Sequence, residues 1–247
     1  MNLATVQKLL SLNRQFYQSF ADQFSETRQR LQPGVRKIIE SVSPAARLLD
    51  LGCGNGELAR NLAKRRHTSL YIGVDFSPRL LSMRPKDVLP GNFTFIQADL
   101  ASHGWAARVR SSTFNLTPPN FDLILAFAVL HHLPGEDLRR QVLGEALSLL
   151  APGGRFIHSE WQFLNSPRLR QRIQSWETAG LLPADVEPGD YLLDWRRGGS
   201  GLRYVHHFEP EELASLAEAT GFQVLETFFS DGEGGRLGLY QVWEKIV

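Results

Sequence analysis

The sequence has few cysteines, few lysines and no long apolar run, and each shortage excludes a class of protein. A single cysteine, Cys53, cannot form an intrachain disulfide or a cysteine-cluster metal site, so we expect no metal ion. Apolar runs such as 121–130 are far shorter than the roughly 20 residues of a membrane-spanning helix. Residues 1–18 lack the continuous apolar core of a signal peptide. We therefore expect a cytoplasmic protein.

The near-zero net charge of +1 argues against a protein that coats nucleic acid. It is a cancellation, because residues 1–110 carry 16 basic against 8 acidic side chains, whereas residues 111–247 carry 11 against 18. The basic residues are 22 Arg and 5 Lys, and Arg suits carboxylates and phosphates. The charge distribution is compatible with a basic surface that admits an anionic ligand, and equally with an Arg-rich genome that produces the same count.

Five near-continuous apolar segments alternate with helix candidates over residues 46–160. Such segments are typical of strands buried on both faces of a parallel sheet, and their alternation with helices indicates a doubly wound α/β sheet. The length suits one domain. The predicted strands are 47–52, 69–75, 93–99, 121–129 and 154–160, and the helix candidates between them are 57–66, a short turn at 78–83, and 135–150.

The flanking segments have other patterns. Residues 1–44 predict amphipathic helices, and 166–180 and 209–221 each predict one helix. Residues 222–230 and 237–246 alternate as strands do, and the turn-rich stretch between them predicts a closing hairpin. Residues 111–120 predict a loop.

The strongest motif is LLDLGCGNGELA (48–59), in which Gly52, Gly54 and Gly56 separate a predicted strand from a helix. Glycines let a ligand approach the backbone, and a helix N-terminus offers free amide donors. Asp75 and Asp99 end the next two predicted strands, so they lie at the sheet edge where such folds bind ligands. Asp75 can accept hydrogen bonds from a ribose diol and Asp99 from an adenine amino group. The glycine turn and the two aspartates together predict an adenosine-containing ligand.

The glycine spacing distinguishes between adenosine ligands. It is G-x-G-x-G, and Glu57 stands where the dinucleotide motif G-x-G-x-x-G needs its third small residue. The carboxylates of Asp50 and Glu57 would repel a pyrophosphate but tolerate an ammonium and a sulfonium. S-adenosylmethionine is thereby favoured over NAD, and the absence of G-K-[ST] excludes a Walker-type loop.

In this order, DLGCGNG, GVDFS, ADL, FDLILAFAVLHHL and LAPGG closely resemble the class I S-adenosylmethionine-dependent methyltransferases over roughly residues 45–160. The resemblance implies a Rossmann-like, doubly wound seven-stranded sheet with an antiparallel last strand. In one domain, 1–44 would be a helical cap, 45–160 the cofactor-binding core, 161–208 a substrate-side insertion and 209–247 the closing helix and hairpin. The cofactor-binding residues implied are Arg28, Asp50, Gly52, Gly54, Gly56, Asp75, Phe76, Asp99, Leu100, Ala126 and Phe127.

Three further segments, 20–28 (FADQFSETR), 189–198 (GDYLLDWRRG) and 203–213 (RYVHHFEPEEL), look like the tRNA wobble-uridine carboxymethyl methyltransferases. Those enzymes esterify a carboxylate on a modified uridine in the anticodon loop, and some use a small helper protein. The chain departs from them at Tyr204-Val205, where paired aromatics are usual, and in a longer C-terminal turn. The resemblance implies a tRNA substrate; a small carboxylate substrate is the alternative, and the short apolar runs predict no membrane partner. The expected substrate-positioning residues are Arg28, His132, Arg203, Tyr204 and His206.

The chemistry of the acceptor leaves alternatives open. A carboxylate is already deprotonated at pH 7 and needs only alignment and cationic or hydrogen-bonding clamps. A phenol or amine would need a general base, for which His131, His132, His206 and His207 are candidates. Trp161, Trp176 and Trp195 could stack on a base. A small-molecule carboxyl or O-methyltransferase and a non-catalytic cofactor-binding subunit are the competing hypotheses.

Overall fold

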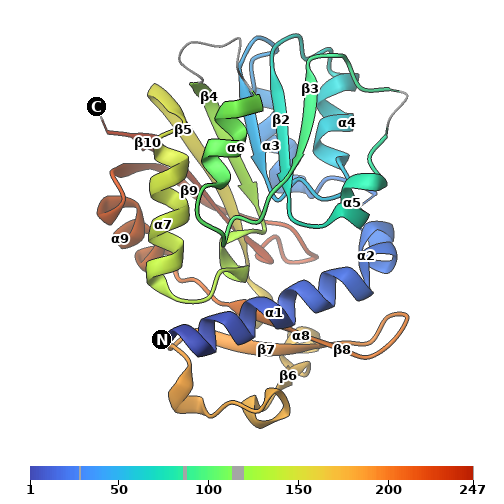
Figure 1. Cartoon of the computed structure of the whole chain (residues 1–247), viewed down its shortest axis with the longest axis vertical. Helices are drawn as coiled ribbons and strands as arrows, with labels where there is room; N and C mark the ends of the chain where they lie inside the picture. Colours follow the sequence, from blue (N-terminus) through green and yellow to red (C-terminus); the bar gives the residue numbers. More distant parts are fainter. Residues whose placement is uncertain (28, 86–87, 113–119, 247) are drawn as a thin grey trace.

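The computed structural model describes residues 1–27, 29–85, 88–112 and 120–246, and its centre is a seven-stranded sheet between two helical layers (Figure 1). The strand order is β3-β2-β1-β4-β5-β10-β9. The first five strands in this order, β3, β2, β1, β4 and β5, pair in parallel. Strand β10 is antiparallel to both of its neighbours, β5 and β9. The predicted fold is thereby confirmed. The strands are β1 (Leu48–Leu51), β2 (Tyr71–Asp75), β3 (Phe93–Gln97), β4 (Phe121–Phe127), β5 (Leu150–Trp161), β9 (Phe222–Ser230) and β10 (Gly238–Lys245).

The continuous apolar strands arise because helices cover both faces of the sheet. Successive β1 residues show this: Leu48 packs with the layer of α3 (Pro33–Ser41) and α4 (Glu57–Lys64). Leu49 packs on the opposite face with α6 (Trp105–Ser112), α7 (Glu136–Leu147) and α9 (Pro210–Ala219). Beyond β2, the short helix α5 (Pro78–Ser82) starts at Ser77, whose hydroxyl accepts a hydrogen bond from the Leu80 amide at 3.2 Å.

A second unit crosses the carboxyl-terminal edge of the sheet (Figure 1). It consists of α1 (Leu3–Ser19), α2 (Ala21–Thr27) and a small antiparallel sheet of β6 (Ile173–Gln174), β7 (Asp190–Trp195) and β8 (Gly201–His206). Asn13 of α1 joins these parts, since its side chain accepts from the Tyr204 amide at 2.8 Å and donates to the Tyr204 carbonyl at 3.2 Å. We call this unit the cap. It does not include α3, although the sequence predicted a cap that extends to residue 44. The helix α3 packs instead on the main sheet.

Some details of the predicted elements are wrong. The helix expected at 166–180 is α8 (Pro167–Arg170), strand β6 and a 3-10 turn, Trp176–Ala179. Its apolar spacing suits a helix, but pairing of Ile173 with Leu193 of β7 prevails. The helix expected at 135–150 ends at Leu147, and β5 runs through Pro152-Gly153-Gly154.

The helix α6 was not expected, and it includes the first two residues, Ser111 and Ser112, of the predicted loop 111–120. Residues 113–119 of that loop lie outside the described residues. Among the helices that the structure describes, none has both the length and the apolarity needed to cross a bilayer.

Candidate cofactor and acceptor site

The glycine-rich turn has the left-handed backbone that its sequence predicts. The φ angles of Gly52, Gly54 and Gly56 are 71°, 54° and 74°, a region that other residues rarely adopt. A Cβ on Gly52 would lie 2.7 Å from the Cγ2 atom of Val129, whereas one on Gly54 would have no atom within 4 Å. Gly52 thus allows the turn to pack on the end of β4, and Gly54 leaves space for a ligand.

Asp75 is held at the end of β2 by two backbone amides. Its Oδ2 atom accepts from the Gly54 amide at 2.9 Å, and its Oδ1 atom accepts from the Ser77 amide at 2.8 Å. Burial raises the pKa of Asp75 to about 6, although both amides favour the ionised form. Each carboxylate oxygen retains acceptor capacity beyond its amide bond. The carboxylate is therefore oriented to accept hydrogen bonds from a diol.

Asp50 lies beneath the glycine turn and is not one of the residues that line the cleft. It accepts a 2.5 Å hydrogen bond from the Tyr71 hydroxyl, and burial raises its pKa to about 7. The neighbouring Cys53 does line the cleft, and burial together with Asp50 and Asp75 raises the pKa of its thiol well above the usual range. Asp50 thus links β1 to β2 through a buried hydrogen bond.

The cleft has a volume of about 330 Å³ and extends from the carboxyl ends of the strands to α1. Asp99 is oriented on its wall by two contacts: its Oδ1 atom accepts from the Ala101 amide at 2.9 Å, and its Oδ2 atom pairs with Arg14 of α1 at 2.6 Å. The ion pair connects the cap to the strand end where the adenine is expected. Arg14 is a site residue that the sequence pattern did not indicate.

Arg203 of β8 lines the same cleft from the cap side. Aromatic rings surround its guanidinium: the carbon Cζ lies 4.5 Å from the Trp161 ring centroid, 5.4 Å from that of Phe16 and 5.8 Å from that of Trp195. Rings at these distances stabilise a cation through their quadrupoles. Of the three tryptophans that could stack on a base, Trp161 alone is among the described lining residues.

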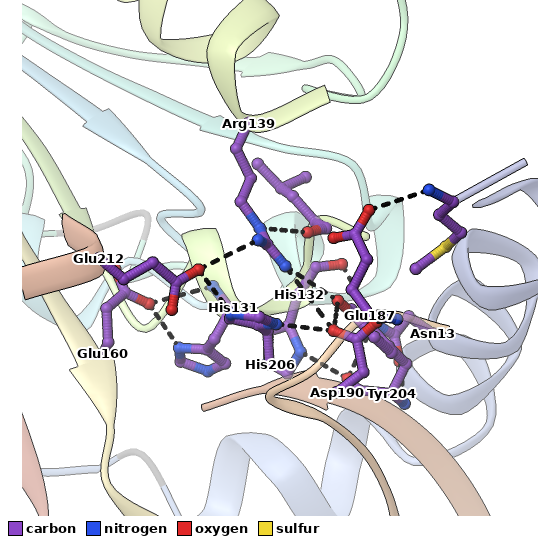
Figure 2. Close-up of polar contacts among 12 residues, drawn as sticks. Asn13, His131, His132, Arg139, Glu160, Glu187, Asp190, Tyr204, His206 and Glu212 are labelled. Atoms are coloured by element: carbon purple, nitrogen blue, oxygen red, sulfur yellow. Dashed lines mark hydrogen bonds and ion pairs between the residues drawn. The ribbon is translucent and has the colours of Figure 1, made fainter. Parts of the chain in front are cut away.

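Tyr204 and His206 do not line the cleft. They lie in a buried polar network between the cap and the core (Figure 2). The Tyr204 hydroxyl donates to Asp190 at 2.7 Å and accepts from Arg139 of α7 at 3.2 Å. His206 lies 2.7 Å from Asp190 and 2.8 Å from Glu212. Both side chains therefore lie in the contact between the cap and the core, outside the described lining of the cleft.

The His206 imidazole is subject to opposing influences. Burial disfavours its charged form, but the hydrogen bonds to Asp190 and Glu212 outweigh burial, and the pKa of His206 is raised. The contact of His206 with Glu212 also brings α9 into the network. Protonation of His206 thus strengthens the attachment of the cap.

A second buried cluster reaches the cleft at His131 and Glu160. The Glu160 carboxylate lies 2.7 Å from the Nδ1 atom of His131, as Figure 2 shows. It also lies 2.9 Å from the Nδ1 atom of His158. Burial raises the pKa of Glu160 well above its usual range and lowers the pKa of His158 to about 3. His158 is therefore neutral, and Glu160 fixes the orientation of His131.

The cleft brings together most of the predicted site residues. Gly56 and Ala126 are next in sequence to lining residues without being among them, Asp50 is not a lining residue either, and Arg28 lies outside the described residues. The predicted residues that line the cleft are Gly52, Gly54, Asp75, Phe76, Asp99, Leu100, Phe127, His132 and Arg203. Lining residues that no sequence motif indicated include Arg14, Tyr17, Arg30, Glu160, Asp231 and Tyr240.

The strand order, the antiparallel β10 and the glycine turn facing Asp75 define the class I methyltransferase architecture. Comparison with known proteins agrees: residues 17–227 match a family model described as a methyltransferase domain. The chain belongs to this methyltransferase family, and it is an S-adenosylmethionine-dependent methyltransferase.

Two curated relatives represent different acceptors. The chain is 26% identical over 225 residues to the tRNA (carboxymethyluridine(34)-5-O)-methyltransferase of Schizosaccharomyces pombe, covering 86% of this chain and 89% of that protein. It is 35% identical over 127 residues to the trans-aconitate 2-methyltransferase of Acidovorax ebreus, covering 51% and 43%.

Solved structures share the fold. An S-adenosylmethionine-dependent methyltransferase from Methanosarcina mazei has a TM-score of 0.63 at 20% identity, covering 88% of this chain and 99% of that one. A chain from the complex of the Haloferax volcanii Trm112 methyltransferase activator with a methyltransferase has a TM-score of 0.64 at 13% identity, covering 94% and 96%.

The described residues fit the expected cofactor, S-adenosylmethionine. Asp75 offers acceptors for a ribose diol, Asp99 offers one for an amino group, and an added Cβ on Gly54 would meet no atom within 4 Å. When bound, the cofactor supplies an electrophilic methyl group. The protein has to align the acceptor with it and exclude water.

Proposed function

We propose that this methyltransferase esterifies a carboxyl group on a modified uridine of tRNA. The observation that carries the proposal is Arg203, a buried cation that lines the same cleft as Asp75 and lies among three aromatic rings. An arginine in such surroundings suits an anionic acceptor, and Trp161 beside it suits a planar base.

Two relatives support a carboxylate acceptor. The S. pombe relative, which aligns along most of both chains, is named for carboxymethyluridine, and the shorter match is named for trans-aconitate, itself a carboxylate. A carboxylate needs no general base, so recognition by cations and hydrogen-bond donors is sufficient. Esterification removes the negative charge, and the neutral product consequently loses its attraction to Arg203.

A second candidate function, methylation of a small phenol or amine, has its own supporting observation. His131 lines the cleft and is oriented by Glu160 at 2.7 Å, as a general base would be. A relative named ubiquinone biosynthesis O-methyltransferase, 24% identical over 183 residues, supports an O–H acceptor. Substitution of Arg203 or of His131 therefore distinguishes a carboxylate acceptor from a phenol or amine acceptor.

A helper protein is part of the proposal as well. The Haloferax volcanii structure is a complex of a Trm112 methyltransferase activator with a methyltransferase. This chain has the same fold as a chain of that complex. Assays of the proposed activity therefore include the chain alone and the chain co-expressed with an activator of that type. Turnover by the chain alone would exclude a purely non-catalytic subunit.

The experiment uses labelled S-adenosylmethionine and two tRNA preparations, one carrying carboxymethyluridine and one lacking all modifications. We expect label only in the first, released by mild alkali as an ester is. Arg203→Ala should reduce kcat/KM at least tenfold, since a hydrogen bond to a charged group is worth about 1.5–3 kcal/mol. Arg196→Ala, which removes an exposed cap arginine paired with Asp194, is the matched control.

Transfer to neither tRNA, with transfer to a phenol that His131→Gln abolishes, would establish the second candidate instead. Transfer to small carboxylates but not to tRNA would confine the activity to metabolites. An Arg203→Ala enzyme with wild-type kcat/KM would contradict the assigned role of Arg203.

A further inference from the structure

A phenol–imidazole pair lies in the cleft and has not been assigned a role above. Tyr17 of α1 and His132 of the 3-10 turn Leu130–His132 both line the cleft. The Tyr17 hydroxyl oxygen lies 2.7 Å from the Nε2 atom of His132, and the rings meet edge-to-face at 5.5 Å. The pair joins the cap to the end of β4.

The surroundings hold both rings in place. Tyr17 packs edge-to-face on Phe24 at 5.1 Å and on Phe76 at 5.9 Å between ring centroids. The His132 carbonyl accepts from the Asn13 amide group at 3.3 Å, as Figure 2 shows for the two labelled residues. The pair is therefore preorganised from three separate segments of the chain.

The partner of the second ring nitrogen determines which way the hydrogen bond runs. The Nδ1 atom of His132 lies 3.2 Å from the Tyr204 carbonyl oxygen, which can only accept. Nδ1 therefore carries a hydrogen, and in the neutral imidazole Nε2 is an acceptor for the Tyr17 hydroxyl. If Nε2 is protonated, the bond reverses: Nε2–H donates to the phenol oxygen, and the phenol hydrogen turns away from His132.

We propose that Tyr17 is a positioning residue that donates a hydrogen bond to the acceptor carboxylate, with a protonated His132 behind it. The inference rests on the proposed function and names a second recognition element beside Arg203. An anion in the cleft favours the charged imidazole, so acceptor binding takes up a proton on His132 and reverses the hydrogen bond. Esterification of a carboxylate consumes no proton, so the pair acts on acceptor affinity and alignment.

Other charged and titratable groups surround the pair, and the experiment must separate them. His131 lies beside His132 at 4.3 Å between ring centroids and is paired with Glu160 of β5. From α1, Arg14 faces the cleft but is paired with Asp99. Tyr204 of β8 contributes its carbonyl. The other charged side chains of the described lining are those of Arg30, Glu57, Asp75, Arg203 and Asp231.

The test measures binding of two nucleosides to the full chain loaded with S-adenosylhomocysteine. One is 5-carboxymethyluridine, and the other is its uncharged amide, 5-carbamoylmethyluridine. We expect Tyr17→Phe to weaken carboxylate binding roughly ten- to hundred-fold, the range for a hydrogen bond to a charged group. Amide binding should change less than fivefold.

Calorimetry in two buffers of different ionisation enthalpy measures the proton. We expect the wild type to take up as much as one proton with the carboxylate and none with the amide. His132→Gln should abolish this uptake while the protein remains folded, because glutamine can hydrogen-bond but cannot be charged. Tyr191→Phe is the matched control: Tyr191 lies in β7 of the cap and packs on Phe163, away from the described cleft lining.

Each outcome decides a separate point. If the wild type binds neither nucleoside and esterifies no tRNA, the proposed function fails. If the wild type esterifies the carboxylate and Tyr17→Phe has an unchanged KM, the inference alone fails. Weaker binding of S-adenosylhomocysteine by Tyr17→Phe, with unchanged selectivity for carboxylate over amide, would place Tyr17 in the cofactor site and overturn the inference.

Discussion

Replacing Asp75 by asparagine separates the contribution of this residue to cofactor binding from its contribution to the fold. The asparagine has nearly the same shape, but it can accept only one of the two amide hydrogen bonds that Asp75 accepts from Gly54 and Ser77. Its amide group would instead oppose one backbone donor. We expect a large loss of cofactor affinity and little change in the stability of the cofactor-free protein.

The magnitudes follow from the environment of Asp75. Burial raises its pKa from 3.8 to about 6, and at 1.36 kcal/mol per unit the ionised carboxylate costs roughly 3 kcal/mol above pH 6. Asparagine removes that cost but leaves one backbone donor unsatisfied, which costs about 1–3 kcal/mol. The two effects largely cancel. A ribose diol that loses its charged acceptor loses about 2–3 kcal/mol, or roughly 30- to 160-fold in Kd.

The assay is calorimetric titration with S-adenosylhomocysteine, together with thermal unfolding at pH 8. Ionised Asp75 is the better acceptor, so wild-type affinity should fall as the pH is lowered from 7.5 to 5 through about 6. Asp75→Asn should show no such fall. The matched control is Asp122→Asn, since Asp122 pairs with Arg47 outside the described cleft lining, and this variant should lose stability but not affinity.

Wild-type affinity in the Asp75→Asn variant would refute the assignment of the ribose diol to Asp75. A fall in melting temperature of more than about 10 °C would refute the energetic reasoning instead, because about 1 kcal/mol shifts a domain of this size by about 2–4 °C. The two readouts are independent, so each failure identifies its own cause.

The other predictions concern the thiol, the buried network and the glycine turn. Cys53 should react with iodoacetamide at pH 8 far more slowly than an exposed thiol, because burial raises the pKa of its thiol. The reaction should be slower still with S-adenosylhomocysteine bound, because Cys53 lines the cleft. Mass spectrometry measures the rate, and rapid labelling would contradict this prediction. A group with a raised folded-state pKa stabilises the fold below its unfolded value, so the difference in unfolding free energy between wild type and His206→Gln should shrink as the pH rises from 6 to 9; a growing difference would reverse the assigned sign. Gly54→Ala should cost about 1–2 kcal/mol for its left-handed backbone, and Gly52→Ala more because its Cβ would also meet Val129 at 2.7 Å; urea unfolding checks the order.

The cofactor half of the site was predictable because its residues follow from local sequence. Gly54, Asp75 and Asp99 each lie at or within three residues of the carboxyl end of β1, β2 or β3, and parallel strands bring these ends to one edge of the sheet. Asp50 shows the limit of this reasoning. It belongs to the same motif, yet it lies under the turn with Tyr71, since successive strand side chains point to opposite faces.

The acceptor half depends on contacts between distant segments. Tyr17 and His132 are 115 positions apart, and the cap brings them within a hydrogen bond. Tyr204 and His206 were predicted to face the substrate, but pairing of β7 with β8 directs them into the buried network with Asp190. No periodicity in the sequence encodes this choice, because it depends on which face of a short sheet packs on the core.

The doubly wound sheet, the glycine turn and the strand-end carboxylates could all be predicted from the sequence. Those features arise from apolar runs, turn residues and the geometry of parallel strands, all of which act locally. The tertiary structure alone decided how the cap closes over them: β6 replaced the predicted helix by pairing with β7, and α1 placed Tyr17 and Arg14 at the cleft. Such long-range contacts are selected by packing and by hydrogen-bond satisfaction over the whole chain, so no short segment encodes them.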